Sequence, residues 1–169
     1  MNRRSAFVLW PWLVILAMLG SLVVVMNMLN RELRQEGECR ARLERIYMAM
    51  ELYELGNGHL PKLDFYPDNP REGRESLRVV LSKYGLLGSD CVCPAAHPLI
   101  QEKGLSYVWN IALNNQSLSG RQQPDWMLIE LEALNPKLRG PHLRQYHILY
   151  TDGKVQRTSR IPYHLPGGN

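Results

Sequence analysis

The sequence predicts an α+β protein in which one long N-terminal helix packs on a small antiparallel sheet. Three observations support this fold class. Residues 7–29 are almost entirely apolar, and residues 31–55 have the composition and spacing of an amphipathic helix. Beyond this helix, the segments rich in β-branched and aromatic residues all follow residue 105. Helices that precede a run of strands indicate an α+β arrangement, in which helix and sheet form separate layers.

The apolar run extends from Phe7 to Leu29 and contains no charged side chain. A helix of this length, at ~1.5 Å per residue, exceeds the ~30 Å hydrocarbon core of a bilayer. We therefore expect a transmembrane helix over residues 7–29. The alternatives are a cleavable secretory signal, which has a shorter apolar core and a small-residue cleavage site, and a buried helix of a soluble protein.

The helix is expected to continue beyond the membrane, because residues 31–55 are rich in the helix-forming residues Glu, Arg, Leu, Met and Ala. Apolar and aromatic side chains repeat there at helical spacing and form one stripe, which is expected to pack on the folded domain. The stripe consists of Leu43, Ile46, Tyr47, Met50 and Tyr53. The Gly56-Asn57-Gly58 sequence, followed by Pro61, predicts the end of this helix.

The rest of the chain reads as loops, one short helix and a group of strands. Prolines and turn-forming residues dominate positions 61–73, which predicts a loop, and a short helix is predicted over residues 75–84. Strand-like composition is found at residues 106–112, 125–131, 146–150 and 155–159. Asp152-Gly153 lies between the last two segments and predicts a hairpin turn.

Charge gives no reason to expect a nucleic-acid partner. The chain carries 20 Lys and Arg residues against 16 Asp and Glu residues, and they are mixed without a basic run. No nucleophile accompanies a positioned base in the sequence, so no enzymatic activity is expected. We also expect no cofactor. In particular, a calcium site is not expected, because Asp125, Glu130 and Glu132 lie along predicted strands rather than in a loop with calcium-ligand spacing.

Three cysteines allow two principal interpretations. In an oxidising compartment one disulfide is expected, and a Cys39–Cys93 bond would tie the long helix to the loop before the sheet. The alternative is a zinc site formed by Cys39, Cys91, Cys93 and His97, although Cys-x-Cys-x-x-x-His is not a standard structural-zinc spacing. We expect the disulfide and no bound metal; three free thiols are the remaining possibility.

The N-terminal segment resembles that of type IV pilins and type II secretion pseudopilins. Residues 7–20, FVLWPWLVILAMLG, align without gaps with that family's segment Phe-Thr-Leu-Ile-Glu-Leu-Leu-Val-Val-Ile-Ala-Ile-Ile-Gly. The resemblance implies a short basic leader at residues 1–6 and cleavage between Ala6 and Phe7 by a prepilin peptidase. Ala6 stands where the family has Gly, and Pro11 stands where it has Glu. These departures imply slow processing and a subunit that does not form filaments by itself.

Later motifs resemble the branch of this family that carries the prepilin-type processing-associated His-x(9)-Asp-Gly pattern. His142 lies the required nine residues before Asp152-Gly153. The stretch from Cys39 to Pro61, the Cys93-Pro94-Ala95 sequence and Ser106-Tyr107 also resemble segments of that branch. We interpret the pattern as structural: Asp-Gly suits a tight turn, and His142, in a polar loop, is expected to hydrogen-bond the sheet edge.

The resemblance implies a non-enzymatic pilin-like or pseudopilin subunit of a bacterial type II secretion or type IV pilus-like envelope machine, minor or non-polymerising. Its helix would lie in the inner membrane. A periplasmic pilin-like domain would span residues 30–160, with a flexible tail at 161–169. Other pilin or pseudopilin subunits and the prepilin peptidase are the implied partners. The alternatives are a membrane-anchored binding module that kept this fold but does not assemble, and an envelope enzyme or zinc protein.

Overall fold

The computed structural model describes residues 3–135, 138 and 140–161, and it describes side chains from residue 12 onward. Most of the expected tail therefore lies outside the described residues, as do the side chains of the expected leader. The chain divides into two compact units, residues 1–34 and residues 35–169.

Helix α1 extends from Arg3 to Asn57 and contributes to both units. It ends where the sequence predicts. Gly58 adopts a positive φ of 78°, and its N–H donates to the Glu54 carbonyl at 2.7 Å, which satisfies one of the last carbonyls of the helix. Gly37, the weakest helix former in this segment, lies within the helix without interrupting it.

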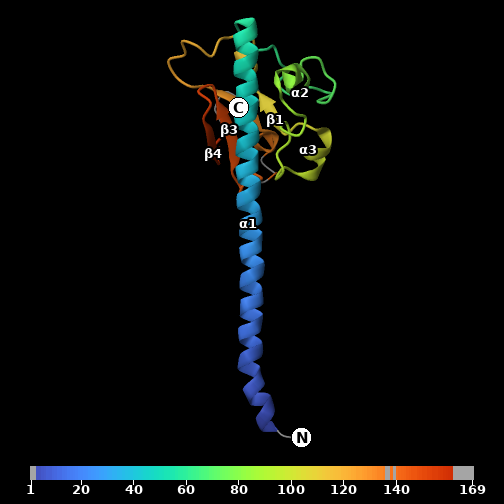
Figure 1. The fold of residues 1–169 in the computed structure, drawn as a ribbon, viewed down its shortest axis with the longest axis vertical. Helices are drawn as coiled ribbons and strands as arrows, with labels where there is room; N and C mark the ends of the chain where they lie inside the picture. Colours follow the sequence, from blue (N-terminus) through green and yellow to red (C-terminus); the bar gives the residue numbers. More distant parts are fainter. Residues whose placement is uncertain (1–2, 136–137, 139, 162–169) are drawn as a thin grey trace. The chain divides into compact units, whose positions relative to one another are not determined.

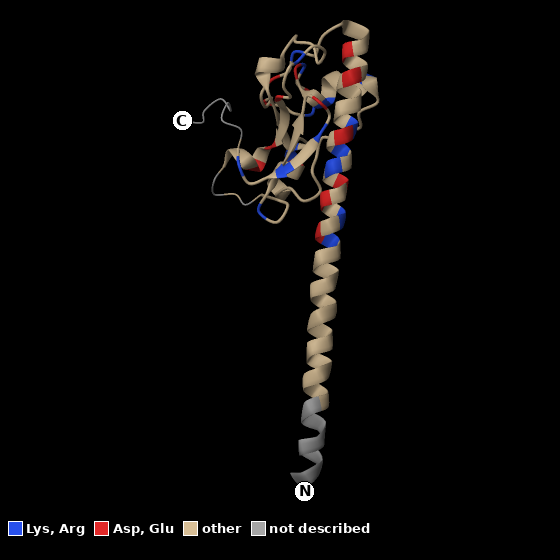
Figure 2. Cartoon of the chain, turned by 90° about the vertical axis from the view of Figure 1, so that its left-hand side faces the viewer, with Lys and Arg blue, Asp and Glu red and all other residues tan. Residues whose placement is uncertain are grey.

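In the first unit, every described side chain of α1 is exposed, from Trp12 to Arg34. In Figure 2, the coloured positions of Lys, Arg, Asp and Glu along the described part of the helix lie beyond its apolar part. This part is long and apolar enough to cross a membrane, and none of it is buried within the chain. An apolar helix that buries no face against its own chain is explained by lipid or by a partner.

In the second unit, the described residues form one four-stranded antiparallel sheet in the order β1-β2-β3-β4. The strands are β1 (Tyr107–Trp109), β2 (Trp126–Glu130), β3 (Tyr146–Tyr150) and β4 (Val155–Thr158). The β3–β4 hairpin turns at Gly153, whose φ of 80° suits the predicted Asp-Gly turn. This long helix followed by a small antiparallel sheet confirms the predicted α+β fold class.

The C-terminal part of α1 packs on one face of the sheet (Figure 1). The predicted stripe lies in this core: Leu43, Ile46 and Met50 are fully buried, and Tyr47 and Tyr53 pack against them partly buried. From the sheet, the same core includes Tyr107, Trp109, Met127, Leu128 and Leu149. Helix–sheet packing therefore buries the face of α1 that the sequence marks as apolar.

The opposite face of the sheet carries a second, smaller core. Val108, Ile129 and Ile148 alternate along the strands with residues of the first core and are fully or almost fully buried. Phe65 and Tyr66, from the loop after α1, pack on this face. Because both faces are covered, every residue of β2 is buried.

Three short elements depart from the sequence prediction. The predicted helix at residues 75–84 is α2 (Leu77–Leu81) followed by a 3₁₀ turn, and it ends at Gly85 with a φ of 85°. The first predicted strand is shorter than expected because the Asn110 side chain accepts the Ala112 N–H and begins a 3₁₀ turn. Helix α3 (Pro98–Lys103) was not predicted. Its six residues are too few to establish a helical period.

Candidate functional site

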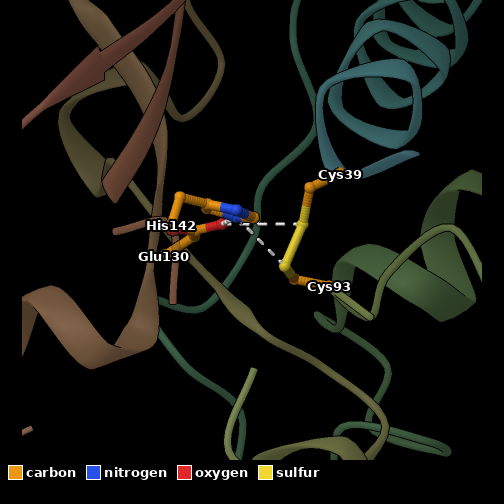
Figure 3. A group of neighbouring side chains, drawn as sticks. All are labelled: Cys39, Cys93, Glu130 and His142. Carbon is orange, nitrogen blue, oxygen red and sulfur yellow. Dashed lines mark hydrogen bonds and ion pairs between the residues drawn. A yellow bond between two sulfur atoms is a disulfide. The ribbon is translucent and has the colours of Figure 1, made fainter. Parts of the chain in front are cut away.

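Four side chains of types that can bind a metal ion lie close together in the core of the second unit. They are Cys39 of α1, Cys93 of the loop before α3, Glu130 at the end of β2, and His142 of the β2–β3 connection. We call these four residues the cluster. All four are buried, and their ligand-type atoms lie within 4.8 Å of one another (Figure 3). The cluster therefore joins the helix, the α2–α3 loop and the sheet at one point.

A disulfide joins Cys39 to Cys93, which is the pair favoured from the sequence. The two residues are separated by 54 positions, and their Cα atoms lie 5.2 Å apart. The bond ties α1 covalently to the loop that precedes the sheet. Because disulfides persist mainly in oxidising compartments, it suggests that this domain lies outside the cytoplasm.

Both carboxylate oxygens of Glu130 have partners. Oε1 lies 2.8 Å from Nε2 of His142, and Oε2 accepts the backbone N–H of His147 at 3.0 Å. Burial by itself raises the pKa of this carboxyl group, but the hydrogen bonds from His142 and His147 outweigh it and hold the pKa of Glu130 below its ordinary value. The site therefore contains a buried, ionised carboxylate at neutral pH.

The two sulfur atoms lie directly beside this pair. Sγ of Cys93 is 3.4 Å from Nε2 of His142, and Sγ of Cys39 is 3.6 Å from Oε1 of Glu130. The hydroxyl of Tyr107 lies 3.7 Å from Sγ of Cys39. Burial and the nearby Glu130 carboxylate raise the pKa of Tyr107, so its hydroxyl stays protonated and able to donate towards the sulfur.

His147 of β3 completes the surroundings of the cluster. Its ring centroid lies 4.2 Å from that of His142, and its Nδ1 lies 3.5 Å from Oε1 of Glu130. Among the described residues, this Nδ1 makes no hydrogen bond although it is buried. A buried polar atom without a partner, next to a carboxylate, is an available donor or acceptor at this site.

The backbone around His142 explains how a loop residue reaches the core. Its N–H bonds to the Gln145 carbonyl, which closes a tight turn. Leu143 and Arg144, inside this turn, have positive φ values of 51° and 69°, a conformation that costs roughly 1–2 kcal/mol for residues with a Cβ. We expected His142 to hydrogen-bond the sheet edge from a polar loop. Its ring is instead buried and lies 2.8 Å from Glu130 of β2, a central strand of the sheet.

The Asp-Gly part of the sequence motif lies away from the cluster, because His142 precedes β3 and Asp152 follows it. Asp152 accepts the Lys154 N–H and pairs with its ammonium group at 2.7 Å. Gly153 packs against Tyr47 of α1 so closely that a Cβ there would lie 2.9 Å from the ring. The motif therefore fixes both ends of β3 and does not form one site.

The structure does not bring the other two residues of the alternative zinc set, Cys91 and His97, into the cluster. Cys91 carries a free, buried thiol, and burial raises its pKa to about 12. His97 is exposed and accepts the Leu99 N–H at the start of α3. In the structure, Glu130 and His142, rather than Cys91 and His97, lie beside the two bonded cysteines.

Glu130 and His147 were not predicted as members of this region. A signal for Glu130 was present: it interrupts the apolar run between Ile129 and Leu131, and a charged residue in a fully buried strand needs bonded partners. Nothing comparable distinguished His147 from a surface histidine.

The expected processing site, Ala6 and Phe7, lies outside the residues whose side chains are described. Comparisons of the chain with protein families, with curated proteins and with solved structures found no match. Its function must therefore be inferred from the geometry of the chain itself.

Proposed function

We propose that the protein is a non-enzymatic pilin-like subunit, held in a bacterial inner membrane by α1, with its disulfide-containing domain in the periplasm. One observation carries this proposal: α1 has two parts with opposite burial. Residues 12–34 are exposed on all sides, whereas Leu43, Ile46 and Met50 are fully buried in the core of the domain.

The exposed part of α1 suits a lipid environment. It contains one hydroxyl-bearing residue, Ser21, whose side chain donates to the Met18 carbonyl at 2.8 Å, so no hydroxyl donor is left without a partner in the bilayer. Gly20 lies next to it, and apart from its chain neighbours and the helix backbone no atom lies within 4 Å of the position a Cβ would take. Small residues allow transmembrane helices to approach closely, which supports contact with other helices in the membrane.

The composition of α1 also supports a minor or non-polymerising role. The pilin resemblance places a carboxylate at the position of Pro11, where it would pair with the terminal amine of a neighbouring subunit. A charged side chain at the centre of a bilayer costs roughly 3 kcal/mol, and pairing offsets that cost. A subunit without this carboxylate is stable alone in lipid and lacks the attraction that drives self-assembly.

One hollow in the described surface of the domain has a lining that supports a structural role. A hollow of about 550 Å³ beside the end of α1 is lined by residues that include Tyr47, Glu51 and Glu54. The Glu54 carboxylate accepts bonds from the Ser117 hydroxyl and the Leu118 N–H, so it braces the loop there. We therefore assign this region a structural role.

The N-terminus of the mature protein tests the pilin-like assignment. The full chain is expressed with an active prepilin peptidase or with an inactive variant of it, and membrane-purified protein is analysed by mass spectrometry. A chain that begins at Phe7 only with the active peptidase is expected, and Ala6→Gly should be processed faster. An intact chain from Met1 in every sample would instead favour a membrane-anchored binding module.

Topology and assembly are tested separately. A reporter that is active only outside the cytoplasm, fused after Asn169, should be active. Activity of a cytoplasm-only reporter at that position would overturn the proposed location. The subunit should co-sediment with filaments formed by a complete pilin set and form none when expressed with the peptidase alone.

A further inference from the structure

The cluster has the ligand composition of a closed zinc site. We propose that, in the dithiol form of the protein, Cys39, Cys93, Glu130 and His142 bind one Zn²⁺ ion in tetrahedral coordination. Zinc and the disulfide are then alternative ways to hold α1 against the α2–α3 loop. In the zinc form, Glu130 would in addition link the sheet to the helix and the loop through the metal.

Two distances in the cluster, each between a sulfur and a nitrogen or oxygen atom, are close to those of a zinc site, whereas the two bonded sulfur atoms must separate on reduction. Bonds of ~2.3 Å to sulfur and ~2.0–2.2 Å to nitrogen or oxygen place the ligand atoms of a tetrahedral site ~3.3–3.8 Å apart. Sγ of Cys39 lies 3.6 Å from Oε1 of Glu130, and Sγ of Cys93 lies 3.4 Å from Nε2 of His142. The His142–Glu130 distance of 2.8 Å must lengthen by ~0.5 Å, which small side-chain rotations achieve.

Neighbouring groups already orient these ligands. The His147 N–H holds Oε2 of Glu130, which leaves Oε1 directed at the centre of the cluster. The unpartnered Nδ1 of His147, 3.5 Å from Oε1, can hydrogen-bond the same carboxylate, and the Tyr107 hydroxyl can donate to the Cys39 sulfur. Such outer partners fix the orientation of metal ligands and tune their basicity.

The chemistry of the ligands favours zinc over other common metals. Two thiolates and an imidazole suit Zn²⁺, whereas Mg²⁺ and Ca²⁺ prefer oxygen ligands. Two thiolates and one carboxylate also bring three negative charges into the core, and a divalent ion leaves only one. All four ligands are buried, so the site has the closed coordination of a structural zinc centre, without an open position for a substrate.

The dithiol form is reached without unusual chemistry, since a newly made chain contains thiols before it is oxidised. In vitro, a trialkylphosphine and one water molecule convert the disulfide into two thiols and a phosphine oxide. The two electrons from phosphorus break the S–S bond, and the water oxygen is transferred to phosphorus. Zn²⁺ then replaces the two thiol protons, which are released to solvent.

The full-length chain in detergent, reduced under anaerobic conditions with a trialkylphosphine, is the material for the test. Titration with Co²⁺ should produce thiolate-to-cobalt charge-transfer absorption and the visible bands of tetrahedral Co²⁺, saturating at one ion per chain. Zn²⁺ should displace the cobalt and raise the thermal midpoint of the reduced protein. The disulfide form should give neither signal.

Variants separate this site from adventitious binding. Cys39→Ser and Cys93→Ser should abolish the charge-transfer band, and Glu130→Gln should weaken zinc binding about tenfold or more. Cys91→Ser and His97→Gln are the matched controls and should bind as the wild type does. Circular dichroism checks that each variant folds. If a variant does not fold, the proposal is tested on the reduced wild type, in which zinc should protect Cys39 and Cys93 against alkylation.

Two outcomes overturn the proposal. One is a folded, reduced wild-type protein that shows no thiolate-to-cobalt band and no zinc protection. The other is a loss of binding in Cys91→Ser or His97→Gln as large as that in Cys39→Ser. Neither outcome bears on membrane topology or N-terminal processing, so the proposed function is tested independently.

Discussion

Nε2 of His142 lies 2.8 Å from Oε1 of Glu130, and the two side chains are only 1% and 0% exposed. For a pair this deeply buried, losing one partner costs more than the intact pair contributes to stability. Each partner satisfies the other, but removal of one leaves a buried polar or charged group without its principal partner. The burial of His142 therefore predicts a large contribution of this side chain to stability.

His142→Ala should therefore destabilise the oxidised protein by about 3–5 kcal/mol, because the ionised carboxylate of Glu130 stays buried without its imidazole partner. Chemical denaturation of the full chain in detergent, with the disulfide intact, measures the change. His97→Ala is the control. His97 is exposed and only caps a short helix, so its loss should cost about 1 kcal/mol. Equal effects of the two substitutions would contradict the structural role assigned to His142.

Gly153→Ala should destabilise the fold by at least about 1–2 kcal/mol, because the residue has a φ of 80° that residues with a Cβ disfavour, and its Cβ would lie only 2.9 Å from the Tyr47 ring. Gly153→Val should be worse, since valine adds two methyl groups at the same crowded position. Thermal unfolding measures both. Gly56→Ala should be neutral or stabilising, because nothing lies within 4 Å of its Cβ position and alanine favours helix. A silent Gly153→Val would refute the turn assignment.

Loss of the disulfide should lower the stability of the metal-free protein by about 4 kcal/mol, since the bond closes a loop of 54 residues in the unfolded chain. The measurement compares the denaturation midpoint of wild type with that of Cys39→Ser, both in the presence of a chelator. Cys91→Ala keeps the disulfide and should remain much closer to wild type. An unchanged midpoint in Cys39→Ser would show that non-covalent packing alone holds α1 to the loop.

Cys91 should resist alkylation in the native, non-reduced protein at about pH 8 and react once the protein is unfolded. Its side chain is 0% exposed, and burial raises its pKa from 9.0 to about 12, so the reactive thiolate is absent. Iodoacetamide labelling followed by mass spectrometry should find one modified cysteine in the unfolded chain and none in the native one. Rapid native labelling would mean that the loop around Cys91 opens.

The same pKa shift predicts a loss of stability at high pH. The folded state keeps the Cys91 proton that the unfolded chain releases, so this contribution is complete below pH 9.0 and declines as pH rises towards about 12. Tyr47, with a pKa raised to about 12, acts in the same direction. Cys91→Ala should reduce the slope of unfolding free energy against pH in this range, and an identical slope would exclude the contribution.

Local signals in the sequence were sufficient to predict the long helix, its end near Gly58 and the hairpin at Gly153. Each depends on residues that are neighbours in the chain: an apolar period, a left-handed helix end, and an Asp-Gly turn. The shortened strand β1 and helix α3 were harder to predict, because each boundary depends on the side chain of one residue. Asn110 begins the 3₁₀ turn that follows β1, and His97 caps the start of α3.

The site could be predicted only in part, because its members come from four segments of the chain. Cysteine chemistry alone favoured Cys39 and Cys93. Glu130 and His142 join them only through the sheet register and through the left-handed turn at Leu143 and Arg144, which no glycine marks in the sequence. Long-range convergence of this kind depends on tertiary packing and leaves little trace in local composition.

The position of Cys39 has a mechanical consequence. It is the first fully buried residue along the described part of α1. Tension applied along the helix from its N-terminal end therefore reaches the domain core at Cys39, and the bond to Cys93 transfers the load to the loop before the packing of Leu43 and Ile46 is strained. With the bond in place, the whole domain must resist the pull together. Without it, the helix can peel from the sheet one turn at a time, at a much lower rupture force.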